Sequence, residues 1–217
     1  MIKRSNAVSI FCITCISLSS YAQKTIRPDL SNANRFHVVN REISITQNDN
    51  KKDVVHLNGL PNDGIAWIND LKFDKGVIEF DAKGKNVVQQ SFIGIAFHGM
   101  NDTSFDAVYF RPFNFQSPDA IRKTHSVQYV SLPQFDWSVL REKYPGKYEN
   151  GITDNIGADS WFHAKIIVDA DKIEVFVNNN RQASLTVKPL NSYTTGKIGF
   201  WVGNNSDGDF TNLEIKQ

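Results

Sequence analysis

The sequence predicts an all-β fold, a sandwich of antiparallel strands that forms one domain over residues 36–217. Thirteen short runs rich in β-branched and aromatic residues follow one another over this range. Turn-forming pairs such as Asn58-Gly59 and Lys75-Gly76 connect the runs tightly, as in antiparallel meanders. A helical period is visible only in residues 135–144, where one or two turns are expected.

The expected strands alternate between apolar and polar residues, which assigns one face of each to a core. In order, they are FHVVN (36–40), ISIT (43–46), DVVHL (53–57), GIAWI (64–68), GVIEFDAKG (76–84), SFIGIAFHG (91–99), DAVYFR (106–111), HSVQYVS (125–131), WFHAKIIVDAD (161–171), IEVFVNN (173–179), ASLTVK (183–188), GKIGFWVG (196–203) and FTNLEIK (210–216).

The N-terminus has the pattern of an export signal. Lys3 and Arg4 precede a short apolar run at 7–18, and the small residues that follow predict cleavage after residue 22. We therefore expect residues 1–22 to be removed and residues 23–35 to form a flexible leader. The mature protein is expected to be secreted or periplasmic.

Composition excludes several partner classes. The chain has 24 Lys and Arg against 23 Asp and Glu, with no basic stripe, so nucleic acid and anionic membrane surfaces are not expected to bind. Cys12 and Cys15 both lie in the signal, which excludes disulfides and thiolate catalysis from the mature domain. We expect a monomer.

One connection is much longer than the others. Residues 132–160 contain no expected strand, and loops of this length in compact domains usually bind or cover a ligand. The segment contains Trp137, Arg141, Tyr148 and Glu149. Because exposed aromatic side chains are costly, we expect this loop to fold over one face of the sandwich.

The stretch from Phe105 to Trp137 has the composition of a binding surface. Tyr109 and Arg111 share one strand face, Gln128 lies on a following strand, and Asn114 lies in the loop between them. Planar polar groups bind hydroxyl pairs and aromatic rings stack on sugar C–H faces, so a polyhydroxylated ligand is expected. We also expect Trp137, Arg141 and Tyr148 to contact it. Ordinary cross-strand pairing of these side chains is the alternative.

Arg111 gives the sharpest expectation at this stage. Pro112 holds it extended at the end of its strand, which would direct the guanidinium into a cleft. The Arg111→Lys substitution is then expected to weaken ligand binding at least about tenfold and to leave stability nearly unchanged.

The order of these segments resembles the concanavalin A-like lectin/glucanase superfamily, and most closely the laminin-G-like and 3-keto-disaccharide-hydrolase-like domains of exported bacterial proteins. The motifs concerned are FDKGVIEFDAKG, SFIGIAFHG, VYFRPFNF, WFHAKIIVDADKIEVFVNN and GKIGFWVGNNSDGDFTNLEI. The resemblance covers about residues 53–217. It implies a two-sheet jelly roll with a concave, glycan-facing sheet.

Catalytic candidates come from the requirement of glycosidases for two carboxyl groups across a sugar bond. Glu149 and Asp106 are the acids expected at the site, and His98 shares a strand face with small residues suited to a groove floor. Glu79 and Asp81 begin the E-x-D-x-x-E motif of family-sixteen glycosidases, but Gly84 stands where its last Glu belongs. We therefore interpret this pair as a solvated strand face.

Metal binding is weakly indicated. The turn GNNSDGDF contains Asn204, Asp207 and Asp209, an oxygen-rich set that could hold calcium, but it lacks the spacing of an EF-hand. A hairpin turn explains the same residues, and no other cofactor is expected.

The sequence thus predicts an exported protein that binds oligo- or polysaccharide in a cleft. Whether it also hydrolyses its ligand stays open. The alternatives are a non-catalytic lectin-like module, a polysaccharide lyase using His98, Tyr109, Arg111 and Gln128, or a laminin-G-like interaction domain.

Overall fold

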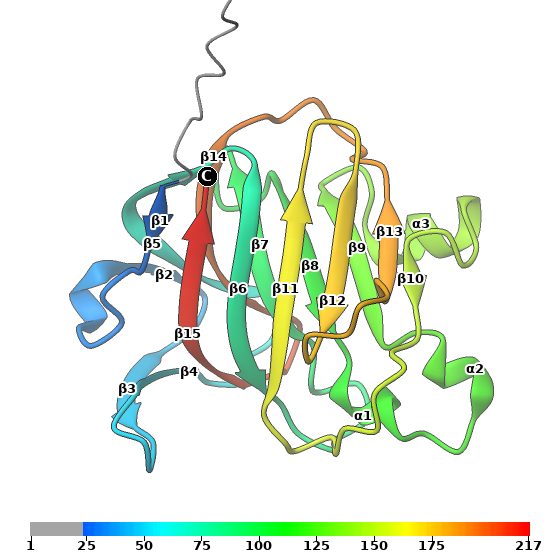
Figure 1. The fold of residues 1–217 in the computed structure, drawn as a ribbon, viewed down its shortest axis with the longest axis horizontal. Helices are drawn as coiled ribbons and strands as arrows, with labels where there is room; N and C mark the ends of the chain where they lie inside the picture. The colour runs from blue at the N-terminus through cyan, green and yellow to red at the C-terminus, as the bar shows by residue number, and fades with distance from the viewer. Residues whose placement is uncertain (1–23) are drawn as a thin grey trace, which may run out of the picture.

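A computed structural model describes residues 24–217, and the expected signal peptide and Gln23 lie outside the described residues. Two antiparallel sheets face each other as a jelly-roll sandwich (Figure 1). Sheet A has eight strands, ordered β13-β12-β11-β6-β15-β4-β3, with β1 added to β15. Sheet B has seven, ordered β10-β9-β8-β7-β14-β5-β2. The expected all-β sandwich is confirmed.

All thirteen expected strands are present. Sheet A contains β1 (Thr25–Ile26), β3 (Ile43–Gln47), β4 (Asp53–Leu57), β6 (Gly76–Lys83), β11 (Phe162–Val168), β12 (Ile173–Val177), β13 (Leu185–Val187) and β15 (Gly208–Lys216); sheet B contains β2 (Phe36–Val39), β5 (Gly64–Phe73), β7 (Ile93–Gly99), β8 (Phe105–Phe110), β9 (Val127–Leu132), β10 (Glu149–Asn150) and β14 (Gly196–Val202). The two strands that sequence analysis missed, β1 and β10, have two residues each, too few for a period to show.

Helical structure is limited to short segments. These are η1 (Ala33–Arg35), α1 (Pro112–Phe115), α2 (Ala120–Lys123) and α3 (Trp137–Lys143). The last of them confirms the helical turns expected at 135–144. Within residues 24–217, no helix has the length and apolar character needed to cross a membrane.

The core lies between the sheets and is rich in phenylalanine. Phe200 of sheet B stacks on Phe210 of sheet A with ring centroids 4.6 Å apart, and Phe80 packs against both. Further along, Phe110 meets Phe162 at 4.9 Å. Each fully buried ring contributes roughly 1.5–3 kcal/mol of transfer free energy, so these contacts fix the pairing of the sheets.

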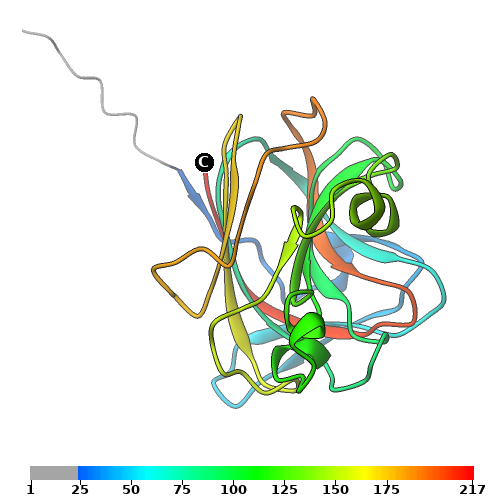
Figure 2. The same ribbon diagram turned by 90° about the vertical axis from the view of Figure 1, so that its right-hand side faces the viewer.

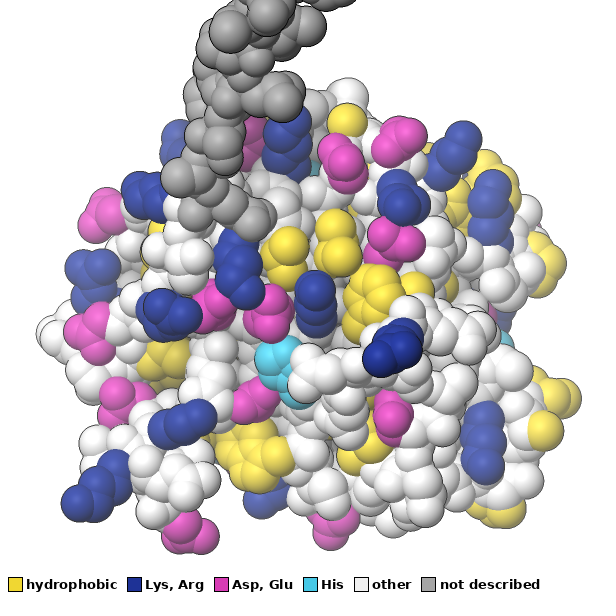
Figure 3. Space-filling model, in the orientation of Figure 1, with side chains coloured by type: hydrophobic (Ala, Val, Ile, Leu, Met, Phe, Trp, Pro, Cys, Tyr) yellow, Lys and Arg dark blue, Asp and Glu magenta, His cyan; other side chains and the backbone are white. Residues whose placement is uncertain are grey.

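The two outer faces differ. In sheet A, burial alternates along β6 and β11, so one face packs in the core and the other meets solvent. Figure 3 shows basic and acidic side chains interspersed over this outer face. In sheet B, every residue of β7 and β8 is buried, because the outer face is also covered. Part of the cover is α3, which packs against β9 from outside (Figure 2).

The N-terminal segment differs from the flexible leader expected for residues 23–35. β1 pairs with the end of β15, and Lys24 and Gln217 exchange two backbone hydrogen bonds of 2.8 and 3.0 Å. Leu30 is buried a few residues later. The physical reason is that β4 pairs only with the beginning of β15. The backbone groups at the end of β15 need hydrogen-bond partners, and the backbone of the N-terminal segment supplies them.

Candidate functional site

A cavity of ≈ 450 Å³ lies on the outer face of sheet B. Its volume falls within the roughly 300–1,000 Å³ of small-molecule sites. β8, β9 and β14 supply the floor, and the segments at 87–92, 111–125 and 136–141 supply the sides. The lining residues are Asp63, Val88, Gln89, Phe92, Tyr109, Arg111, Phe113, Asn114, Arg122, His125, Val130, Leu132, Asp136, Trp137, Arg141, Trp201, Gly203 and Asn204.

Aromatic rings form the floor. The ring centroids of Tyr109 and Trp201 lie 4.9 Å apart. Gly94 lies between them in the sheet and is the register partner of both. A Cβ at Gly94 would come within 2.1 Å of the Val108 carbonyl oxygen, so the close approach of the strands requires glycine there. Phe92 meets the edge of Tyr109 at 6.1 Å.

Tyr109, Arg111 and Gln128 converge as the strand pattern predicted. Nη2 of Arg111 donates to the Tyr109 hydroxyl at 2.8 Å, and that hydroxyl donates to Oε1 of Gln128 at 2.9 Å. Nη2 also donates to Gln128, and Nη1 donates to the His125 carbonyl at 2.9 Å. Burial raises the pKa of Tyr109 to about 12. Contrary to the expectation for Arg111, its guanidinium is therefore already bound to protein groups.

Glu149 lies behind the cavity lining, where two arginines and one histidine surround it. Arg141 donates to its two oxygens from Nε at 3.1 Å and Nη2 at 2.8 Å. His125 Nδ1 lies 2.8 Å and Arg111 Nη1 lies 3.6 Å from Oε2. Burial raises the pKa of Glu149, but the bonds and charge of Arg141 outweigh it and leave the pKa below its ordinary value. An ionised, fully paired carboxylate is poorly suited to be a general acid.

The α3 side of the cavity carries Trp137, which is 47% exposed. The Arg141 guanidinium lies 5.3 Å from its ring centroid, a cation–π distance. Asp136 caps α3 by accepting the Trp137 backbone N–H on Oδ1 at 2.6 Å. Helix, indole and guanidinium are thereby held together at the rim.

Asp63 is a cavity residue that sequence analysis did not identify. It precedes β5, which is separated by three strands of sheet B from β9, the strand before the segment that carries Asp136. Protein atoms crowd its carboxyl although the residue is exposed at the rim; this desolvation, followed by the charge of Asp136, raises the pKa of Asp63 to about 6. Phe92 and Trp201 were also missed as cavity residues. The pairing of Gly94 between Tyr109 and Trp201 would have indicated this floor. That pairing can be recognised only when the register of the sheet is known.

His98 and Asp106, both expected at the site, lie instead at the core side of sheet B. Asp106 accepts the Tyr129 hydroxyl at 2.8 Å and Nδ2 of Asn191 at 2.7 Å, and its Oδ2 lies 3.0 Å from Nδ1 of His98. His98 has a φ of +52° beside a register shift in β14, which turns its side chain away from the face of Gly94. Alternation along the strand had placed it on the opposite face.

Of the two remaining expected residues, Asn114 lines the cavity and Tyr148 does not. Asn114 donates to the His125 carbonyl at 3.1 Å. The ring of Tyr148 packs between Tyr129 and Tyr144 at 6.1 and 5.8 Å.

The side chains of the candidate calcium turn each contact a different partner. Asn204 accepts the Asn62 backbone N–H at 2.7 Å, Asp207 pairs with Lys85, and Asp209 lies 2.6 Å from His56. Among residues 24–217, no group of three or more His, Cys, Asp or Glu side chains is placed to hold a metal ion. The contacts of these side chains join the turn to three other parts of the sandwich.

Glu79 and Asp81 lie on the outer face of sheet A, away from the cavity. His163 Nδ1 lies 2.7 Å from Asp81, and Lys216 donates to Glu79 at 2.9 Å. This agrees with the interpretation of these acids as a solvated strand face.

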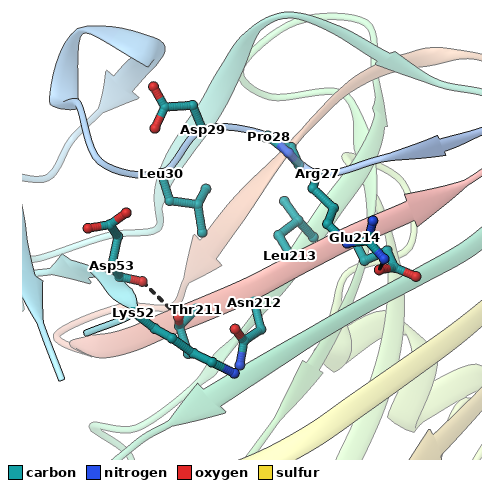
Figure 4. A pocket seen from close by; sticks show the side chains of 10 residues that line it. All are labelled: Arg27, Pro28, Asp29, Leu30, Lys52, Asp53, Thr211, Asn212, Leu213 and Glu214. Carbon is teal, nitrogen blue, oxygen red and sulfur yellow. Dashed lines mark hydrogen bonds and ion pairs between the residues drawn. The ribbon is translucent and has the colours of Figure 1, made fainter. Parts of the chain in front are cut away.

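A second hollow of ≈ 390 Å³ lies between the N-terminal segment and β15 (Figure 4). Its charged groups include the ion pair of Arg27 with Glu214, and Thr211 Oγ1 donates to the Asp53 carbonyl at 2.7 Å. None of the described residues that line it is aromatic. The cavity on sheet B is therefore the better candidate site.

No protein-family model matches the sequence. No curated protein matches it either. Solved structures do match. The carbohydrate-binding module CBM66 of Bacillus subtilis superposes with a TM-score of 0.57 at 12% identity, over 83% of this chain and 95% of that one.

The mannose- and Ca²⁺-bound exoplasmic domain of VIP36 gives a TM-score of 0.54 at 12% identity, over 84% of this chain and 82% of that one. A Bacillus licheniformis β-glucanase gives a TM-score of 0.50 at 14% identity, over 80% of this chain and 81% of that one. The chain thus has the concanavalin A-like jelly-roll fold, which hosts both binding proteins and enzymes.

Proposed function

We propose that the protein binds carbohydrate in the cavity on the outer face of sheet B. The observation that carries this proposal is the joint presence of Tyr109, Trp201 and Trp137 around one cavity with fixed polar groups between them. Aromatic faces bind the C–H face of a sugar, and side chains that can donate or accept bind its hydroxyls. The fold shared with a carbohydrate-binding module and a mannose-bound domain supports the same class of ligand. We also propose that the protein is exported.

Binding is favoured over the catalytic alternatives by the positions of the candidate groups. His98 and Asp106 belong to the core side of sheet B, and Glu149 is held by an ion pair with Arg141. A lyase would need a proton acceptor at the floor, but the Tyr109 hydroxyl is engaged and its pKa is raised. A laminin-G-like interaction domain would be expected to expose an apolar rim. The polar groups of this cavity favour a sugar ligand instead.

Hydrolysis is a second candidate function, favoured by one observation. Asp63 and Asp136 are the two carboxyl residues that line the cavity, and Asp63 has the raised pKa expected of a general acid. Release of new reducing ends from laminarin, xylan, mannan or levan, and its loss in both Asp63→Asn and Asp136→Asn, would support this function.

Affinity electrophoresis tests the main proposal. Gels containing laminarin, mixed-linkage β-glucan, xylan, mannan or levan should retard the purified protein with at least one polysaccharide. Trp201→Phe, which shrinks the floor, should reduce the retardation. Trp161→Ala is the matched control, because Trp161 is 38% exposed and does not line the cavity. Migration that no polysaccharide changes, together with an unreactive glycan array, would reject carbohydrate binding.

A further inference from the structure

The rim of the cavity contains a second aromatic group, distinct from its floor. The floor rings of Tyr109 and Trp201 are 3% and 5% exposed and belong to β8 and β14. Trp137 is 47% exposed and belongs to α3, which stands over β9. One face of its indole is backed by Arg141. A ring supported in this way is held ready to stack on a ligand outside the floor.

The polar groups beside Trp137 match the needs of one sugar unit. Arg141 uses Nε and Nη2 on Glu149, so its Nη1 lies outside that fork. Asp136, next to Trp137 in the chain, supplies carboxylate oxygen at the cavity. Sugar hydroxyls both donate and accept, so a guanidinium N–H, a carboxylate and an aromatic face together are complementary to a single ring.

Glu149 holds this rim in position without lining the cavity. It lies on β10, directly opposite Gln128 of β9 in the sheet register. Its bidentate pair with Arg141 joins α3 to the same strand pair that carries the Arg111, Tyr109 and Gln128 cluster. Bidentate pairing fixes orientation as well as distance. The depressed pKa of Glu149 keeps this pairing intact in mildly acidic solution.

On the basis of the proposed carbohydrate binding, we infer that Asp136, Trp137 and Arg141 form an outer subsite separate from the Tyr109 and Trp201 floor. The ligand is therefore an oligosaccharide whose neighbouring units occupy both places. Glu149 is the positioning residue of the outer subsite and acts through Arg141.

Chain-length dependence of affinity tests this inference. The probes are laminari-, cello-, xylo-, manno- and fructo-oligosaccharides of one to six units, titrated calorimetrically into the purified protein. The wild type should bind longer oligomers of the recognised series more tightly than the monomer. Trp137→Ala should weaken binding of trimers and longer chains by about threefold to tenfold and should weaken monosaccharide binding less, because the floor also holds a single unit. Trp161→Ala, an exposed tryptophan outside the cavity, should change neither.

Glu149→Gln should produce the same selective loss for longer chains, and Arg141→Ala should not weaken binding further in that background. If Glu149→Gln proves unstable to urea, the exposed Trp137 variant decides the matter. Equal affinity for all chain lengths in the wild type, or equal losses for monomer and oligomer in Trp137→Ala, would overturn the outer subsite while leaving carbohydrate binding intact. Absence of binding to any oligomer would instead reject the proposed function.

Discussion

Nη2 of Arg111 lies 2.8 Å from the hydroxyl oxygen of Tyr109, and its guanidinium carbon lies 4.9 Å from the centre of the same ring. A single cation thus bonds to the edge of the tyrosine and covers its face. Glu149 and Gln128 complete the environment of the guanidinium. The hydrogen-bond donors of Arg111 are therefore directed to protein groups at the floor of the cavity.

Arg111→Lys should destabilise the protein by about 1–3 kcal/mol, because lysine cannot serve three acceptors in one plane. This prediction replaces the sequence-based expectation of unchanged stability, because Arg111 also forms an ion pair with the buried Glu149. Urea unfolding measures the effect. Arg122→Lys is the control, because that side chain lines the cavity but is 53% exposed. Equal stability of the wild type and Arg111→Lys would show that the cluster is dispensable.

Tyr129→Phe should cost about 1–3 kcal/mol of stability without altering the cavity. The lost hydroxyl donates to Asp106 at 2.8 Å and accepts the Leu190 backbone N–H at 3.2 Å, both on the core side of sheet B. Tyr144→Phe, at a residue 38% exposed, is the matched control. A loss of glycan binding without loss of stability in Tyr129→Phe would contradict the assignment of this network to the core.

Carboxyl NMR titration should give Asp63 a pKa of about 6, and Asp136→Asn should lower it. Because the folded pKa lies above the unfolded value near 3.9, the folded state binds more protons between these values, and stability falls as pH rises through that window. Asp63→Asn should therefore be more stable than wild type at pH 7 but not at pH 3.5. Asp171→Asn, in an exposed hairpin, should show no such gain. An Asp63 pKa unaffected by Asp136→Asn would separate the two carboxyls.

His163 should add a pH-dependent contribution on the other face of the molecule. Its hydrogen bond and charge interaction with Asp81 raise its pKa above 6.5. The added stability is fully present below pH 6.5 and is lost as pH rises through the raised pKa. Urea unfolding at pH 5.5 and pH 9 should show a larger difference for wild type than for His163→Gln. His37→Gln, at a largely exposed side chain, should keep the wild-type difference. An unchanged pH profile in His163→Gln would contradict the pairing.

The sequence by itself determined the all-β class of the fold and the positions of most strands. Alternation along β6, β11 and β12 identified their buried faces, and the thirteen strand runs followed from local composition. The convergence of Tyr109, Arg111 and Gln128 was also predictable, since neighbouring antiparallel strands place such residues side by side. These features depend on a period of two and on tight turns, both of which are local properties of the chain.

Only the tertiary structure decided which groups share the cavity. The positive φ of His98 turned its side chain to the core side. Pairing of β10 with β9 placed Glu149 beside two arginines and His125. Trp201 of β14 and Asp63, the residue before β5, joined the cavity from parts of the chain distant from residues 105–137. Register shifts and long-range pairing depend on the balance of packing and backbone hydrogen bonding across both sheets, which no local pattern records.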